Sequence, residues 1–215
     1  GLFEGKISDQ QPIKNVMPYS LNSPLFSDYA HKLRFVQLPN GEHVAYNPDS
    51  VFQFPVGTTI AKTFYYYNDE KDPSKGRRLM ETRILIHEAK GWKSLPYIWN
   101  EEQTDAILEV AGGSDEVAWI DASGKKQSFV YQVPNMNQCK GCHERSGEMT
   151  PIGPSVRQLN DGHQLQKWET VGLLKGLPKD HIPALVNYSD ASASLDDRVK
   201  AYLDINCAHC HNATG

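Results

Sequence analysis

Two stretches decide the fold: residues 58–67 read TTIAKTFYYY, and residues 79–87 read LMETRILIH. Both are rich in β-branched and aromatic residues, which fit a pleated, half-buried strand. In the first stretch Ile60, Phe64 and Tyr66 share one face because side chains alternate along a strand. The second stretch alternates a largely apolar face with a polar one: Met80, Thr82, Ile84 and Ile86 against Glu81, Arg83 and His87.

The same signals recur outward from these stretches, with turn residues between them. Strands are predicted at 33–38, 51–54, 58–67, 79–87, 92–99, 117–120 and 129–133. Pro96 is expected to break the strand at 92–99, and Ala122-Ser123-Gly124 is expected to close a hairpin. Residues 31–134 are therefore predicted to be a β-rich scaffold, an antiparallel sandwich or barrel, preceded by an extended N-terminal arm at 1–30.

After Pro134 the pattern changes to loops with two helices, at 164–174 and 195–206. Ser194 followed by Asp197 is close to a capping box, which marks the start of the second helix. That helix carries an apolar stripe formed by Leu195, Val199, Tyr202 and Leu203. Residues 135–215 are predicted to be a loop-rich, part-helical region. The chain is therefore expected to be mostly β up to residue 134 and α+β overall.

The composition is that of an ordinary globular protein, and it argues against nucleic-acid binding and against a membrane-spanning segment. The 215 residues are 39% hydrophobic and 22% charged, with a formal net charge of −4. We expect no nucleic-acid partner, because the chain has no excess of basic residues that could neutralise phosphates. No apolar run approaches the roughly 18 residues that a membrane helix needs, so we expect no transmembrane segment.

All four cysteines fall in two C-x-x-C-H pentads, 139–143 and 207–211. With 8 histidines in 215 residues, a His after both pairs by chance has a probability of about 0.002. The pattern is that of c-type haem attachment. It predicts two covalently bound haem c groups, held through Cys139, Cys142, Cys207 and Cys210. His143 and His211 are the predicted proximal ligands of the two irons.

The four cysteines have two alternative uses, a zinc site and redox disulfides. A structural zinc site would use all four, but it does not require a His directly after each pair. Two local redox disulfides would need a βαβ context that the sequence lacks. Because haem is attached covalently outside the cytoplasm, the haem interpretation predicts a periplasmic or extracellular protein.

The sixth ligand of each iron is harder to predict. Met raises the reduction potential of a haem and His lowers it. The candidates that we rank first are His31, beside the first long strand, His163, just before a predicted helix, and Met149, six residues after His143. His209 lies inside the second pentad and could serve a neighbouring haem.

The helix at 195–206 running into the second pentad resembles the opening helix of a class I cytochrome c domain. That family supplies its distal Met from tens of residues further on, and only four residues follow His211. The resemblance therefore implies that upstream residues or another subunit cover this haem, or that the sequence is shorter than the gene product.

Segments along most of the chain resemble a family of secreted bacterial dihaem c-type cytochromes of largely unassigned function. The matching segments are Pro24–Ala30, Phe54–Thr58, Leu95–Glu101, Asn137–Cys139 and Pro151–Pro154. The resemblance implies an exported dihaem protein and supplies neither a substrate nor a distal ligand.

The leading hypothesis is an exported dihaem cytochrome that exchanges electrons with redox partner proteins. Self-assembly through the C-terminal haem and the N-terminal arm would extend it to an oligomer or filament with haems in a continuous chain. The rival is a dihaem peroxidase-like oxidoreductase, which requires one five-coordinate iron beside a distal Glu or Gln. A third interpretation makes the scaffold a carbohydrate-binding module through Trp92, Tyr97 and Trp99, although strand aromatics are more often core.

Overall fold

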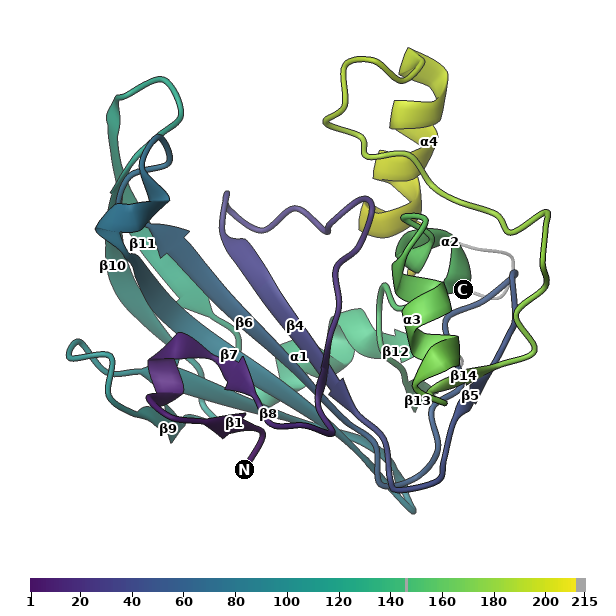
Figure 1. The fold of residues 1–215 in the computed structure, drawn as a ribbon. Helices are drawn as coiled ribbons and strands as arrows, with labels where there is room; N and C mark the ends of the chain where they lie inside the picture. Colours follow the sequence, from purple (N-terminus) through teal and green to yellow (C-terminus); the bar gives the residue numbers. More distant parts are fainter. Residues whose placement is uncertain (146, 212–215) are drawn as a thin grey trace.

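A six-stranded antiparallel sheet forms the body of the protein in the computed structural model, which describes residues 1–145 and 147–211 (Figure 1). The mostly β, antiparallel architecture predicted from the sequence is confirmed. The strand order is β3-β4-β6-β7-β8-β9. The strands are β3 (Met17–Pro18), β4 (His31–Gln37), β6 (Thr59–Tyr67), β7 (Arg77–Glu88), β8 (Gly91–Trp99) and β9 (Ala106–Leu108).

Strand β8 continues through Pro96, so the predicted break is wrong. Pro96 lies opposite Arg83 of β7, and its carbonyl accepts a hydrogen bond from the Glu109 amide on the other side. The nitrogen and carbonyl of one strand residue point to the same side, so the Pro96 nitrogen also faces away from β7. Pairing with β9 begins only at Tyr97, so the missing N–H removes no ladder bond.

A β-bulge in β7 changes which face its side chains occupy. Phe64 lies opposite Glu81 and Tyr65 opposite Leu79, which leaves Met80 without a partner in β6. Met80 packs in the same cluster as Phe64. Both sheet faces are covered, and Glu81 is fully buried although the alternation predicts a polar face there.

The predicted hairpin exists and is longer than expected, with β10 (Gly113–Ile120) paired to β11 (Lys126–Val133). Val117, Trp119 and Tyr131 pack on Phe64 and on other residues of the main sheet. The hairpin rises from one end of the sheet, and the helices that follow residue 155 gather at the other end (Figure 1). The middle of this face lies between the two groups of elements.

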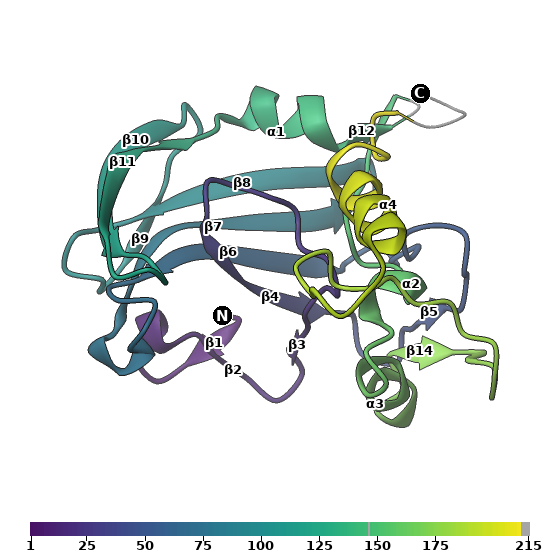
Figure 2. The same cartoon turned by 90° about the horizontal axis from the view of Figure 1, so that it is seen from above.

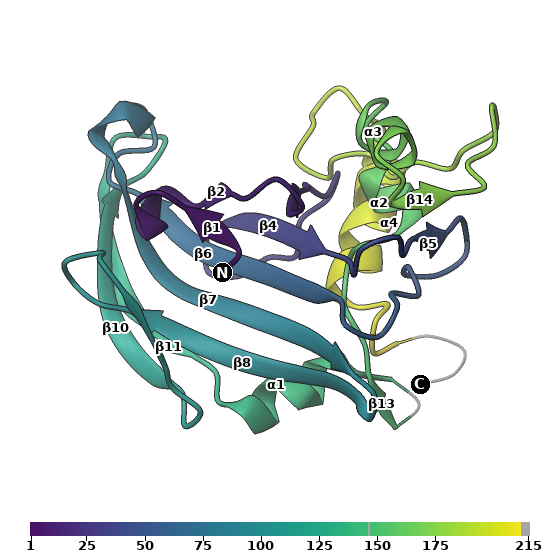
Figure 3. The same cartoon turned by 60° about the horizontal axis from the view of Figure 1, so that its bottom comes forward.

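The first part of the N-terminal arm, residues 1–18, covers the opposite face of the sheet (Figure 3). It contains β1 (Phe3–Glu4), the 3-10 turn Ile7–Asp9, β2 (Gln11–Pro12) and β3. Val16 packs with Phe35 and Ala61, and β3 pairs with β4. The arm is therefore bound within its own chain.

The region after residue 134 shares a core with the sheet. Its elements are α1 (Met136–His143), β12 (Glu144–Arg145), β13 (Glu148–Met149), α2 (Val156–Leu159), α3 (Gln164–Thr170), β14 (Leu174–Lys175) and α4 (Leu195–Asn206). β14 pairs in parallel with β5 (Val44–Ala45), and Pro73–Lys75 is a second 3-10 turn. Val156 and Trp168 pack in one cluster with Val36, Ile60 and Leu85 of the sheet.

Two predicted elements differ from the structure. Residues 51–54 form no strand beyond a single bridge between Val51 and Ser155, because Phe52 and Phe54 insert into the core beside Trp168. The helix predicted at 164–174 ends at Thr170. Gly172 has a φ of 80°, and the amide of Leu173 donates to the carbonyl of Trp168, which is a glycine-terminated helix end.

Candidate functional site

The first pentad lies on helix α1, in a segment that the sequence predicts to be loop. Asn135 caps the helix: its side chain accepts from the Gln138 amide at 2.9 Å, and the Gln138 side chain accepts from the Asn135 amide at 2.9 Å. This Asn-x-x-Gln pattern is a signal from which the helix was predictable. Cys139, Cys142 and His143 are three and four residues apart, so they lie on one side of the helix.

His143 is held in one tautomer. Its Nδ1 lies 2.7 Å from the carbonyl oxygen of Thr150, and because a carbonyl only accepts, Nδ1 carries the proton. Burial lowers the pKa of His143 to about 4, so the imidazole is neutral at pH 7 and Nε2 keeps its lone pair. Metal-ligating histidines are commonly oriented in this way, with the second nitrogen bound to a backbone carbonyl.

A cavity of about 480 Å³ opens beside this helix. Helix α1 contributes Cys139, Cys142 and His143, and apolar side chains such as Leu21, Ile60, Leu85 and Ile152 line other walls. The volume lies within the usual range for sites that bury a small molecule or cofactor, about 300–1,000 Å³. We call this space the pentad cavity. Figure 2 shows α1 running along the β8 edge of the sheet, with α4 nearby.

The second pentad continues directly from α4, which begins and ends at the predicted residues, 195 and 206. Ser194 caps it by accepting from the Asp197 amide at 3.1 Å. The carbonyl of Cys207 accepts from the amides of Cys210 and His211, so the pentad folds into a tight turn. Cys207 is half-buried, whereas Cys210 and His211 are exposed.

The predicted apolar stripe of α4 faces solvent, not the core. Leu195 is 73% exposed, Val199 47% and Leu203 49%. The helix instead packs through Ala201 and Ile205, which are buried. The small Ala201 allows a close approach, and the stripe is left open beside the second pentad.

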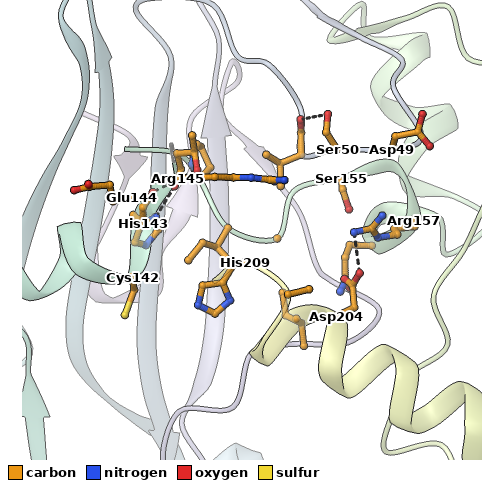
Figure 4. A pocket seen from close by; sticks show the side chains of 18 residues that line it. Asp49, Ser50, Cys142, His143, Glu144, Arg145, Ser155, Arg157, Asp204 and His209 are labelled. Atoms are coloured by element: carbon orange, nitrogen blue, oxygen red, sulfur yellow. Dashed lines mark hydrogen bonds and ion pairs between the residues drawn. The ribbon is translucent and has the colours of Figure 1, made fainter. Parts of the chain in front are cut away.

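The two pentads lie close together although 63 residues separate them. Cys142 and His143 line a second, smaller pocket together with Ala208 and His209 (Figure 4). His209 also lines the pentad cavity. An ion pair of 2.8 Å between Arg157 of α2 and Asp204 of α4 holds the second pentad there.

The three candidate distal ligands lie elsewhere. His31 contacts Glu70 at 2.9 Å and stacks on Tyr65, in a pocket at the hairpin end of the sheet. His163 is exposed at the start of α3. Met149 lies opposite Glu144 in the short β12–β13 pair and packs against the core. None of the three lines the pentad cavity, whereas His209 does.

Sequence reasoning missed three cations that line the pentad cavity from the sheet: Arg34 on β4, Lys62 on β6 and Arg83 on β7. Lys62 lies directly opposite both Arg34 and Arg83. We call these residues the cation row. Each of these charged residues interrupts a stretch of β-forming residues, and such an interruption is a sequence signal that could have marked them as candidates.

The structure gives no support to redox disulfides, to a zinc site or to carbohydrate binding through Trp92 and Trp99. All four cysteines are free thiols. Within residues 1–145 and 147–211, no three His, Cys, Asp or Glu side chains gather where they could hold a metal ion. Trp99 is buried and donates to Thr82, and Trp92 packs against the core and stacks on His87, so these two rings serve packing.

Comparison of the chain with known protein families, with curated proteins and with solved structures found no match. None of the described helices combines the length and the apolar character that a membrane span requires.

Proposed function

We propose that the protein is an exported dihaem c-type cytochrome that carries electrons between redox partner proteins. Each C-x-x-C-H pentad would hold one haem c through two thioether bonds and one histidine. When bound, the haem iron supplies one-electron chemistry by alternating between Fe(III) and Fe(II). The remaining tasks belong to the polypeptide, which binds, orients and encloses the group.

The observation that carries the proposal is the arrangement around His143. The Thr150 carbonyl holds Nδ1–H, so the free Nε2 is available as an iron ligand. Cys139 and Cys142 lie on the same helix and line the same cavity. The donor set, the tautomer and the space therefore fit a haem attached at this pentad.

The second pentad supports the proposal through its surroundings. The exposed apolar stripe of α4 ends beside it. A large apolar macrocycle is one group that would remove such side chains from water. His209, which faces the first pentad, is a candidate distal ligand for the haem attached there, in addition to the three predicted from the sequence. Burial lowers the pKa of His209, so its neutral form is favoured.

The test is to produce the chain in a bacterial periplasm with haem attachment machinery, and to count haems by intact mass and by pyridine haemochrome absorbance. The expected result is two covalent haems. Cys139→Ser with Cys142→Ser, and Cys207→Ser with Cys210→Ser, should each leave one. A colourless protein with the mass of the bare chain would refute the proposal.

The same material separates the electron carrier from the peroxidase-like alternative. Low-temperature EPR should show six-coordinate, low-spin iron at both sites. A high-spin, five-coordinate iron together with peroxide turnover would favour the catalyst instead.

A further inference from the structure

The cation row is unfavourable for the polypeptide by itself. Arg34 and Arg83 each lie directly opposite Lys62 across antiparallel pairs. Like charges in directly opposite positions destabilise a sheet. The row also lies in the wall of a cavity instead of in open solvent, where water would screen the repulsion.

Only one of the three cations forms an ion pair among the described residues. Arg83 makes two hydrogen bonds to the buried Glu81 carboxylate, at 2.6 and 2.8 Å. In contrast, Nη2 of Arg34 is buried and has no hydrogen-bond partner. Lys62 makes no hydrogen bond or ion pair within the described chain, and its Nζ lies 4.6 Å from the centre of the Phe64 ring.

Burial acts on both unpaired cations. It lowers the pKa of Arg34, which is 7% exposed, and it lowers the pKa of the half-buried Lys62 well below its ordinary value. A buried cation is usually paired or hydrogen-bonded, because removing it from water is otherwise costly. The two side chains therefore indicate an anionic partner that is not part of the polypeptide.

We infer that Arg34 and Lys62 bind the propionate carboxylates of the haem attached to Cys139 and Cys142. This inference rests on the proposed function and adds the residues that orient the macrocycle. A c-type haem is attached along one edge and carries its two carboxylates at the opposite edge. A matching site needs cations set back from the cysteines, inside the same cavity.

The strand order places the cations in that way. Helix α1 packs against β8, and Arg83 on the neighbouring strand β7 is close enough to Cys139 for the two to interact electrostatically. The row then leads away from the cysteines, through Lys62 on β6 to Arg34 on β4. With strands about 4.8 Å apart, Arg34 lies roughly 10 Å beyond Arg83.

Tyr19 completes the far end of the row. It lines the cavity, and its backbone amide donates to the carbonyl of Arg34 at 2.9 Å. Burial raises the pKa of Tyr19 to about 12, so its phenol keeps its proton. Tyr19 can therefore donate a neutral hydrogen bond beside the charged contacts of Arg34 and Lys62.

The experiment compares holoprotein variants that remove one cation each, Lys62→Leu and Arg34→Leu. Lys62→Arg keeps the charge, and Lys93→Leu removes an exposed cation from the same sheet as a matched control. Covalent haem is counted first by mass. Resonance Raman spectroscopy then reports the propionate bending modes, and spectroelectrochemistry gives the reduction potential of each haem.

Both cation removals should leave two covalent haems, shift the propionate modes, and move one of the two potentials to a more negative value. A nearby cation disfavours the extra positive charge of oxidised iron and so raises the reduction potential. Removing that cation therefore lowers the potential. Lys62→Arg should retain most of the wild-type potential, and Lys93→Leu should change neither readout. Tyr19→Phe, which removes only a hydroxyl, should give a smaller shift of the modes and guards against variants that fold poorly.

Three results would overturn the inference. If Lys62→Leu, Arg34→Leu and Tyr19→Phe all match Lys93→Leu in both readouts, the row does not contact haem carboxylates, although the haem count still supports the proposed function. If added inorganic phosphate shifts the wild-type potential and the cation removals abolish that response without changing the propionate modes, the row binds a free anion instead. A wild-type protein without haem would refute both proposals together.

Discussion

Lys62→Leu is expected to stabilise the haem-free polypeptide. The substitution replaces a cation that forms no ion pair and no hydrogen bond within the described chain by a shorter, apolar side chain. Replacing buried charged groups by apolar ones is often neutral or stabilises a protein by about 1–4 kcal/mol. The lost contact with the Phe64 ring, 4.6 Å from Nζ, offsets about 0.5–1 kcal/mol of this gain. The net expectation is therefore a gain of up to about 3.5 kcal/mol.

The pH dependence of this gain has a definite sign. Burial lowers the pKa of Lys62 well below 10.5, so between the lowered pKa and 10.5 the unfolded chain binds more protons than the native protein. Stability of the parent protein therefore rises with pH across that window. The advantage of Lys62→Leu should be greatest below the lowered pKa and should shrink as the pH approaches 10.5.

The assay is urea denaturation of a cytoplasmic form in which the four pentad cysteines are replaced by serine, so that no haem is attached. At this chain length, 1 kcal/mol corresponds to about 2–4 °C in Tm, so thermal unfolding should show a rise of up to roughly 14 °C. Lys93→Leu, at an exposed position of the same sheet, should stay within about 0.5 kcal/mol of the parent. A loss of more than about 1 kcal/mol in Lys62→Leu would refute the reasoning, because Lys62 would then be stabilised by the polypeptide itself.

Three further predictions concern the scaffold. Tyr131→Phe removes a 2.6 Å hydrogen bond to the fully buried Glu81 and should lower the free energy of unfolding by about 1.5–3 kcal/mol in urea; an unchanged value would mean that the hairpin is not tied to the sheet there. The Ser123 hydroxyl is the first of several donors that lower the pKa of Asp121, so Asp121→Ala should weaken amide protection in β10 and β11 at pH 7. The difference should decline as pH falls from about 4 towards the lowered pKa of Asp121, and a difference that stays constant over this range would contradict the role of the charge. Ser194→Ala removes the N-cap of α4 and should cost about 1 kcal/mol of local stability by hydrogen exchange, and equal protection in both proteins would exclude the cap.

The sequence by itself determined the element types wherever a local period is strong. The strands around 58–67 and 79–87 follow from alternation and from β-branched and aromatic residues, and the bounds of α4 follow from Ser194 and the apolar residues after it. The spacing of the two pentads predicts their chemistry in the same local way, because the two cysteines and the histidine of each haem site are adjacent in the chain.

Only the tertiary structure decided what lies around those elements. Pro96 stays within β8 because its nitrogen faces away from β7, and Phe52 leaves its predicted strand to fill the core beside Trp168. The register that sets Lys62 opposite Arg34 and Arg83, and the packing that brings His209 to the cavity of His143, join residues far apart in sequence. Local periodicity carries no information about such pairings, because register and packing are fixed by which distant surfaces exclude water together.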